Sequence, residues 1–247
     1  MMISSTSLTS AKRFIRSGFG IKRLYRRLKN RRDRKQCTEK VRSGGVMSTR
    51  REAHVLLGSP VLLADAEVVA LQAYARKADT TIVEIGCAYG GSSLLFLLGK
   101  KDQTRLYSID PFVVDSMDTF QATRDLCYTH VVKALADVGK AERSSAWNLI
   151  PDYSYYAVES WEISIDVLFI DGDHTYDAVV QDFNQWIPYV RKDGYILFHD
   201  SNIAPGTAEG KYNKGWPGPS RLVIELEKHP AVKLVEKIHS ITVFQKK

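Results

Sequence analysis

The fold of this chain is decided by the stretch TIVEIGCAYGGS, residues 81–92. Its apolar first half, residues 81–86, predicts a buried β-strand that ends in a glycine turn. Gly86 permits a sharp exit from the strand, and Gly90 lets the backbone approach a ligand closely because neither residue has a Cβ atom. Ser92 is a candidate N-cap of a following helix. The stretch therefore predicts a strand, a ligand-binding loop and a helix in succession.

Strands and helices alternate on both sides of this unit. Predicted strands lie at residues 81–86, 104–110, 146–150, 165–171 and 194–199, and predicted helices at 64–77, 92–100, 119–137, 154–161, 175–190 and 219–228. Residues 232–237 and 240–245 alternate closely, which is typical of an antiparallel pair at a sheet edge. Because strand–helix alternation builds right-handed βαβ units, we expect the α/β class: a Rossmann-like, doubly wound, mostly parallel seven-stranded sheet with an antiparallel edge strand.

Composition describes a globular protein with room for one substantial core. The chain has 247 residues, of which 44% are hydrophobic and 26% charged, which excludes a disordered or collagen-like chain. It contains no run of 18 apolar residues, so we expect no transmembrane helix. The three cysteines, Cys37, Cys87 and Cys127, are widely spaced and predict no disulfide framework. This usage favours a reducing compartment such as the cytoplasm.

The positive charge is concentrated near the N-terminus. Residues 12–42 hold 14 Lys or Arg and two acids, whereas the rest of the chain holds 21 basic and 26 acidic residues. Large apolar residues within this region fall on one stripe of a helix, namely Ile21, Leu24, Tyr25 and Leu28. We therefore expect a basic helical arm over residues 1–45 and a separate domain over residues 46–247.

The basic arm has several possible partners. Residues 12–42 could lie on an anionic membrane surface, which would make the protein peripheral to a membrane, or they could grip nucleic-acid phosphates. Their Arg- and Ser-rich composition also fits an organelle transit peptide. Alternatively, the arm folds back on its own acidic domain or contacts another subunit of a homo-oligomer.

The ends of the first two predicted strands point to a nucleoside ligand, since ligands of such sheets bind beyond the carboxyl ends of the strands. The pattern Glu84-x-Gly86-x-x-x-Gly90 lacks the G-x-G-x-x-G spacing of dinucleotide-binding proteins, which argues against NAD. Asp110, at the end of the second strand, can accept hydrogen bonds from both hydroxyls of a ribose. Phe112 lies just beyond it and could cover an adenine face.

These residues resemble the class I S-adenosylmethionine-dependent methyltransferase family over roughly residues 60–245. The resemblance implies that Glu84 and the glycine loop hold the methionine part of S-adenosylmethionine, and that Asp110 binds its ribose. It also implies an adenine contact near Ser154. The cofactor-binding residues expected from the sequence are Glu84, Gly86, Gly90, Ser92, Asp110, Phe112 and Asp171.

The fourth and fifth strand ends carry a second polar group of residues. The first holds Asp171, Asp173 and His174, and the second holds His199, Asp200 and, two positions later, Asn202. We expect these acids and imidazoles to converge on one rim, where a cation or a substrate would balance their charges. Carboxylate and amide oxygens suit Mg²⁺ or Mn²⁺. Asp173 and His174 are the candidate catalytic bases.

This second group resembles the metal-dependent O-methyltransferases that act on sugars of natural products and on catechols. The resemblance implies that Asp171 and the adjacent pair His199-Asp200 bind the metal, with Asn202 as an alternative third ligand. His199 departs from the acids usual at its position, which leaves metal dependence open. A metal-free enzyme with His174 as its base remains an alternative.

We therefore expect an O-methyltransferase that acts on a hydroxyl of a small molecule or glycan. The glycine- and proline-rich residues 203–220 predict a lid, whose Tyr212, Lys214 and Trp216 could contact a ring substrate. The alternatives are a nucleic-acid or protein methyltransferase recruited by the basic arm, and another nucleotide-binding α/β enzyme. No Asn-Pro-Pro-Tyr run occurs, which disfavours methylation of a base amine.

Overall fold

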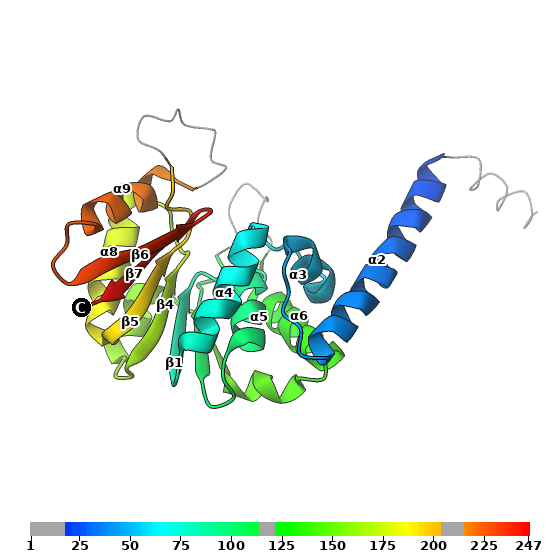
Figure 1. The fold of residues 1–247 in the computed structure, drawn as a ribbon, viewed down its shortest axis with the longest axis horizontal. Helices are drawn as coiled ribbons and strands as arrows, with labels where there is room; N and C mark the ends of the chain where they lie inside the picture. Colours follow the sequence, from blue (N-terminus) through cyan, green and yellow to red (C-terminus); the bar gives the residue numbers. More distant parts are fainter. Residues whose placement is uncertain (1–17, 114–121, 204–214) are drawn as a thin grey trace, which may run out of the picture.

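A seven-stranded sheet forms the centre of the molecule in the computed structural model, which describes residues 18–113, 122–203 and 215–247 (Figure 1). Its strand order is β3-β2-β1-β4-β5-β7-β6. The strands are β1 (Thr81–Ile85), β2 (Arg105–Ile109), β3 (Trp147–Ile150), β4 (Ile165–Ile170), β5 (Val190–Phe198), β6 (Val232–Ile238) and β7 (Ile241–Lys246). Strands β1 to β5 run parallel, whereas β7 is antiparallel to β5 and to β6. The predicted fold class is confirmed.

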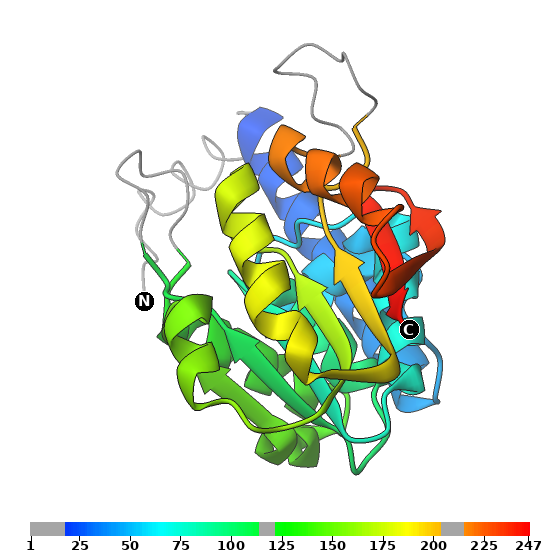
Figure 2. The ribbon, with the colours of Figure 1, turned by 90° about the vertical axis from the view of Figure 1, so that its left-hand side faces the viewer.

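Helices cover both faces of the sheet, as expected for a doubly wound fold. They are α2 (Gly18–Arg42), α3 (Arg50–Leu57), α4 (Asp65–Lys77), α5 (Gly91–Gly99), α6 (Arg124–Asp137), α7 (Ser154–Ala157), α8 (Tyr176–Trp186) and α9 (Pro217–Leu226). Helices α8 and α9 lie on one face, and the helices α2 to α5 lie behind the sheet in the same view (Figure 2). Short 3₁₀ turns at residues 141–146, 158–160 and 187–189 complete the connections.

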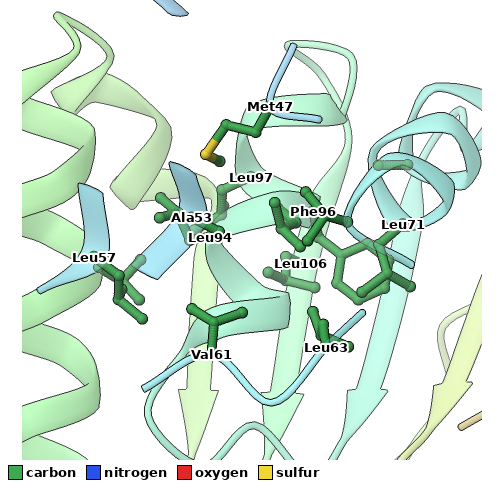
Figure 3. Packing of buried hydrophobic residues seen from close by; sticks show 14 of the residues in the cluster. Met47, Ala53, Leu57, Val61, Leu63, Leu71, Leu94, Phe96, Leu97 and Leu106 are labelled. Atoms are coloured by element: carbon green, nitrogen blue, oxygen red, sulfur yellow. The ribbon is translucent and has the colours of Figure 1, made fainter. Parts of the chain in front are cut away.

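Two hydrophobic cores lie between the sheet and its helices. The first joins α3, α4, α5 and α6 to the sheet, and Figure 3 shows Met47 and Ala53 packed near Leu94, Phe96 and Leu97 of α5. The second packs α8 and α9 against the opposite face. Helix α5 is almost entirely buried, as its sequence GSSLLFLLG implies. This packing fixes the loop between β1 and α5.

Helix α3 was not predicted, although its start has a sequence signal. The hydroxyl of Thr49 accepts a hydrogen bond from the backbone N–H of Glu52, and the Glu52 carboxylate accepts one from the backbone N–H of Thr49. This reciprocal pair is a capping box, which the T-x-x-E spacing at residues 49–52 indicates. At eight residues the helix is too short to show a persuasive apolar period.

The C-terminal part of α2 packs against the domain, so a boundary at residue 45 does not separate two bodies. Cys37 and Val41 are buried in the first core. Arg34 pairs with Asp137 of α6 at 2.5 Å, and Lys40 donates a hydrogen bond to Glu52 of α3 at 2.7 Å. The other end of α2 projects away from the sheet (Figure 1). Among the described helices, none is both long and apolar enough to cross a membrane.

Candidate active site

A cavity of about 820 Å³ opens at the carboxyl ends of the parallel strands. The ends of β1, β2, β4 and β5 and the starts of α5, α7 and α8 surround it. Of the residues that the sequence singled out for cofactor, metal or substrate, those lining it are Gly86, Ser92, Asp110, Ser154, Asp171, Asp173, His174, His199, Asp200 and Trp216. Glu84, Gly90, Phe112 and Asn202 do not line it.

The loop after β1 is held open by glycine geometry. Gly86 has φ +82°, and a Cβ there would lie 2.0 Å from the carbonyl oxygen of Asp171 on the neighbouring strand end. Gly90 also has a positive φ, but a Cβ there would meet Val131 of α6 at 2.4 Å. Gly90 therefore permits contact with α6 rather than with a ligand. It is also the N-cap of α5, so the expectation that Ser92 caps this helix was wrong.

Asp110 organises the same loop. Its Oδ2 accepts hydrogen bonds from the backbone N–H groups of Cys87 at 2.9 Å and Ala88 at 2.8 Å. Its Oδ1 accepts one from the N–H of Phe112 at 2.7 Å. The carboxylate lines the cavity and retains lone pairs for further donors. The Phe112 side chain instead packs against the first core, so the structure does not place it over the cavity.

Glu84 lies beneath the loop and is fully buried. Its Oε2 accepts hydrogen bonds from the hydroxyls of Ser93 at 2.6 Å and Ser108 at 2.5 Å, while Oε1 has no partner among the described residues. Burial raises the pKa of Glu84 to about 7, although the serine hydroxyls oppose the shift and the Asp171 charge adds to it. This placement corrects the expectation of a direct contact between Glu84 and a cofactor in the cavity.

Asp171, His174 and Asp200 converge at the cavity wall. Each can offer one ligand atom, and these atoms lie within 4.8 Å of one another. The Nε2 atom of His174 lies 3.4 Å from Asp200 and 3.8 Å from Asp171, and it is buried without a hydrogen bond to any residue that the structure describes. Burial alone would raise the pKa of Asp171, but the imidazoles of His199 and His174 hold it below its usual value. For Asp200, burial raises the pKa, although the nearby His199 opposes the shift.

His199 takes a different position from the one expected of a metal ligand. Its Nδ1 lies 2.8 Å from Oδ1 of Asp171, and its Nε2 lies 3.3 Å from Oε2 of Glu67 in α4. Both ring nitrogens are therefore engaged by carboxylates, and no lone pair is left for a metal. Burial by itself would lower the pKa of His199, but Asp171 and Glu67 raise it well above its ordinary value. The expectation that His199 ligates a metal is corrected.

The side chains of Asn202 and Asp173 both form hydrogen bonds to the backbone. The side-chain amide of Asn202 donates a hydrogen bond to the carbonyl of His239 at 2.8 Å and lies outside the cavity, so Asn202 is not positioned as a metal ligand. Asp173 lines the cavity but also accepts a hydrogen bond from the backbone N–H of Thr175 at 2.7 Å, just before α8. Tyr212 and Lys214 lie outside the residues that the structure describes.

Comparisons with known proteins agree with this geometry. Residues 83–201 match the family model described as a methyltransferase domain. That match covers just under half of the chain, which is therefore similar to a methyltransferase domain over this region. The matched region contains the glycine loop and both polar strand ends, in agreement with the prediction of a methyltransferase.

Several proteins share the methyltransferase fold at low sequence identity. One is the O-methyltransferase TomG from Streptomyces achromogenes, involved in tomaymycin synthesis and solved with SAM; it has TM-score 0.55 and 15% identity over 85% of this chain and 89% of that one. Another is an O-methyltransferase from Bacillus cereus in complex with SAH, with TM-score 0.53 and 14% identity over 75% and 82%. A curated protein of Acanthamoeba polyphaga mimivirus is 33% identical over 125 residues, 51% of this chain. The match spans about half of that relative, 53% of its length.

One residue at this cavity was not predicted from the sequence, and a second was predicted in a different role. Asp182 of α8 lines the cavity and accepts a hydrogen bond from the Ser154 hydroxyl at 2.5 Å, and burial raises its pKa to about 6, with Ser154 opposing the shift. Trp216 was expected only as a lid residue. Its ring stacks on that of His174, with centroids 5.3 Å apart and planes 14° from parallel. The stack covers the imidazole on one side.

Proposed function

We propose that this methyltransferase transfers the methyl group of S-adenosylmethionine to a hydroxyl of a small molecule or glycan, with a divalent metal at Asp171, His174 and Asp200. The observation that carries the proposal is the buried Nε2 atom of His174, which faces two carboxylates and has no hydrogen bond within residues 18–113, 122–203 and 215–247. A buried nitrogen in this state requires a metal ion, a substrate or a proton.

The donor set fits a divalent ion. Two carboxylates and one imidazole lie within reach of one centre, and Asp171 still has Oδ2 free of the bond to His199. The mixture of oxygen and nitrogen donors favours Mn²⁺ over Mg²⁺, because Mg²⁺ prefers oxygen alone. When bound, such an ion would lower the pKa of the acceptor hydroxyl and orient its oxygen. His174 accepts the hydroxyl proton if no ion is present, and Asp173 is the second candidate base.

The cofactor occupies the neighbouring part of the cavity in this proposal. Gly86 and Ser92 line the region for the methionine part, and Asp110 accepts hydrogen bonds from the ribose hydroxyls. Glu84 acts from outside the cavity by joining the end of β1 to Ser93 of α5 and to Ser108 of β2. Asp171 separates the two regions at the end of β4. Methyl transfer is an in-line displacement, so this chain supplies chiefly alignment of the two substrates and removal of one proton.

The test is a labelled-methyl transfer assay against pools of hydroxylated small molecules and glycans. The enzyme is stripped with EDTA and then assayed alone, with Mg²⁺ and with Mn²⁺. His174→Ala should abolish turnover, whereas His54→Ala, at an exposed position of α3, should not alter it. Binding of Mn²⁺, followed by electron paramagnetic resonance, should be lost in Asp171→Asn and retained in the His54 variant.

The outcomes separate the parts of the proposal. Full turnover of the EDTA-treated enzyme would refute the requirement for a metal ion, and His174 would then remain the candidate base. Transfer only to nucleic acid or to protein would refute the small-molecule or glycan acceptor and favour recruitment through the basic helix.

We also propose that the basic helix binds an anionic membrane surface through residues 12–42. Of these, residues 12–17 lie outside the described part of the chain. Arg31, Arg32 and Lys35 of α2 have no salt bridge to the domain among the described residues. Co-sedimentation with phosphatidylserine vesicles, but not with phosphatidylcholine vesicles, is the expected result, and replacement of Arg31, Arg32 and Lys35 by Glu should weaken it. Self-association through this arm stays a prediction, which sedimentation of the full chain would test.

A further inference from the structure

The cluster at the cavity is connected to a buried carboxylate that no sequence motif marks. Glu67 is the third residue of α4 and is 1% exposed. Its Oε1 accepts hydrogen bonds from the N–H and hydroxyl of Ser240 and from Nδ1 of His239 at 3.0 Å. Its Oε2 accepts one from the N–H of Ala64 at 2.6 Å and faces His199 at 3.3 Å. Glu67 is therefore held from three separate segments of the chain.

His199 connects the Glu67 carboxylate to a residue of the cavity wall. Its ring is 5% exposed and lies edge-on to Phe169 at a centroid distance of 5.9 Å, so it has little room to rotate. One nitrogen meets Glu67, and the other meets Asp171 at 2.8 Å. The result is a continuous line of carboxylate, imidazole and carboxylate from the first turn of α4 to the cavity wall.

Such a line is costly to bury, because charged groups lose their hydration. Apolar side chains of similar volume would fill the same space at lower cost. Its position next to the cavity therefore calls for a role beyond packing. The end of the line is Asp171, which forms the cluster at the cavity wall together with His174 and Asp200.

We propose that Glu67 is a positioning residue, which acts through His199 to fix the orientation of the Asp171 carboxylate for methyl transfer. The role rests on the proposed function, in which Asp171 helps to place the acceptor oxygen. It does not require Glu67 to touch substrate, cofactor or metal. Reactions that depend on alignment lose up to about 10²-fold in rate from a misplacement of about 1 Å.

The test compares Glu67→Gln with Ser240→Ala. The glutamine variant retains the shape of the side chain but weakens the contact with His199. The Ser240 variant removes one hydrogen bond on the Oε1 side, that of the serine hydroxyl, and keeps the backbone N–H of residue 240 and the contact between Glu67 and His199. Both lose anchoring of α4 and the β6–β7 turn, so they form a matched pair for stability.

Two measurements are made on both variants in the full chain. Proton NMR follows the buried imidazole N–H signal of His199 that faces Asp171, assigned by its loss in His199→Phe. Steady-state kinetics follow kcat and KM in the methyl transfer assay. In Glu67→Gln the N–H signal should shift and kcat should fall roughly ten- to hundredfold, with KM for S-adenosylmethionine unchanged. In Ser240→Ala both should stay near the wild-type values.

An unshifted signal in Glu67→Gln, or a shifted signal with wild-type kcat, would overturn the positioning role. A fall in kcat of the same size in Ser240→Ala would also overturn it, since loss of anchoring alone would then explain the effect. If the wild-type protein methylates no hydroxyl, the proposed function fails, while the NMR comparison still decides whether Glu67 controls the contact between His199 and Asp171.

A second variant covers the case in which Glu67→Gln does not fold. His199→Asn places a side-chain N–H close to the position of Nδ1, so it can still donate to Asp171, but it cannot reach Glu67. The same ten- to hundredfold fall in kcat is expected, and wild-type kcat in this variant would overturn the proposal.

Discussion

Replacement of Asp110 by alanine tests the cofactor half of the site. The carboxylate accepts three backbone hydrogen bonds, from Cys87, Ala88 and Phe112, at 2.7 to 2.9 Å. In the proposed complex it also accepts hydrogen bonds from the ribose. Alanine removes the charge and every one of these acceptors, and it leaves the loop N–H groups facing the cavity without their partner.

The expected loss of affinity follows from the ribose contacts. Hydrogen bonds to a charged acceptor contribute roughly 1.5–3 kcal/mol each before the solvation of the freed groups is counted. Since the emptied position is open to water in the cavity, we expect a net loss of about 1–3 kcal/mol. That range corresponds to a Kd for S-adenosylmethionine raised roughly 5- to 150-fold, because 1.4 kcal/mol is a factor of ten.

Isothermal titration calorimetry at constant pH measures this Kd directly. Asp110→Asn serves as an intermediate, because its single carbonyl oxygen can still accept from Cys87 and Ala88 while the charge is lost. Asp152→Ala removes an exposed acid at the end of β3 that does not line the cavity, and it should leave the Kd unchanged. A folded Asp110→Ala protein with wild-type affinity would refute the ribose role.

Two further predictions concern the cavity. Gly86→Ala should abolish cofactor binding, because its Cβ would lie 2.0 Å from a backbone carbonyl. Gly139→Ala, with φ +72° and no described atom within 4 Å of the new Cβ, should cost only about 1–2 kcal/mol in unfolding free energy. The pKa of Asp182, raised from 3.8 to about 6, means that the folded protein binds more protons than the unfolded chain between these values. Stability should therefore fall by up to about 3 kcal/mol as pH rises from 4 to 6. The unfolding free energy of Asp182→Asn, measured with urea, should lack this dependence on pH. A difference in unfolding free energy between wild type and variant that stays constant from pH 4 to 6 would contradict the prediction.

The sequence predicted the strand ends well because their order in a parallel sheet brings them to one edge. Asp110, Asp171 and Asp200 all lie at the cavity, although they are distant in sequence. The edge pair β6 and β7 was also visible as short alternating segments. These features depend on local pattern and on topology, both of which a sequence carries.

The side-chain partners could not be predicted in the same way. Glu67 reads as an ordinary acid in the first turn of a helix, and its contact with His199 spans 132 positions. Without that contact, an exposed lone pair on His199 was a reasonable expectation. Similarly, the widely spaced Cys87 and Cys127 are free thiols whose sulfur atoms lie 4.0 Å apart. Such pairs are set by how helices pack on the sheet.

Helix α2 has a mechanical consequence. It runs without interruption from Gly18 to Arg42, and its 25 residues measure roughly 37 Å at 1.5 Å per residue. Cys37 and Val41 are buried in the core, so the C-terminal end of the helix is fixed to the domain. The basic N-terminal end is therefore held at a fixed orientation relative to the domain by one continuous helix. Any surface that captures the free end would therefore also set the direction in which the mouth of the cavity faces.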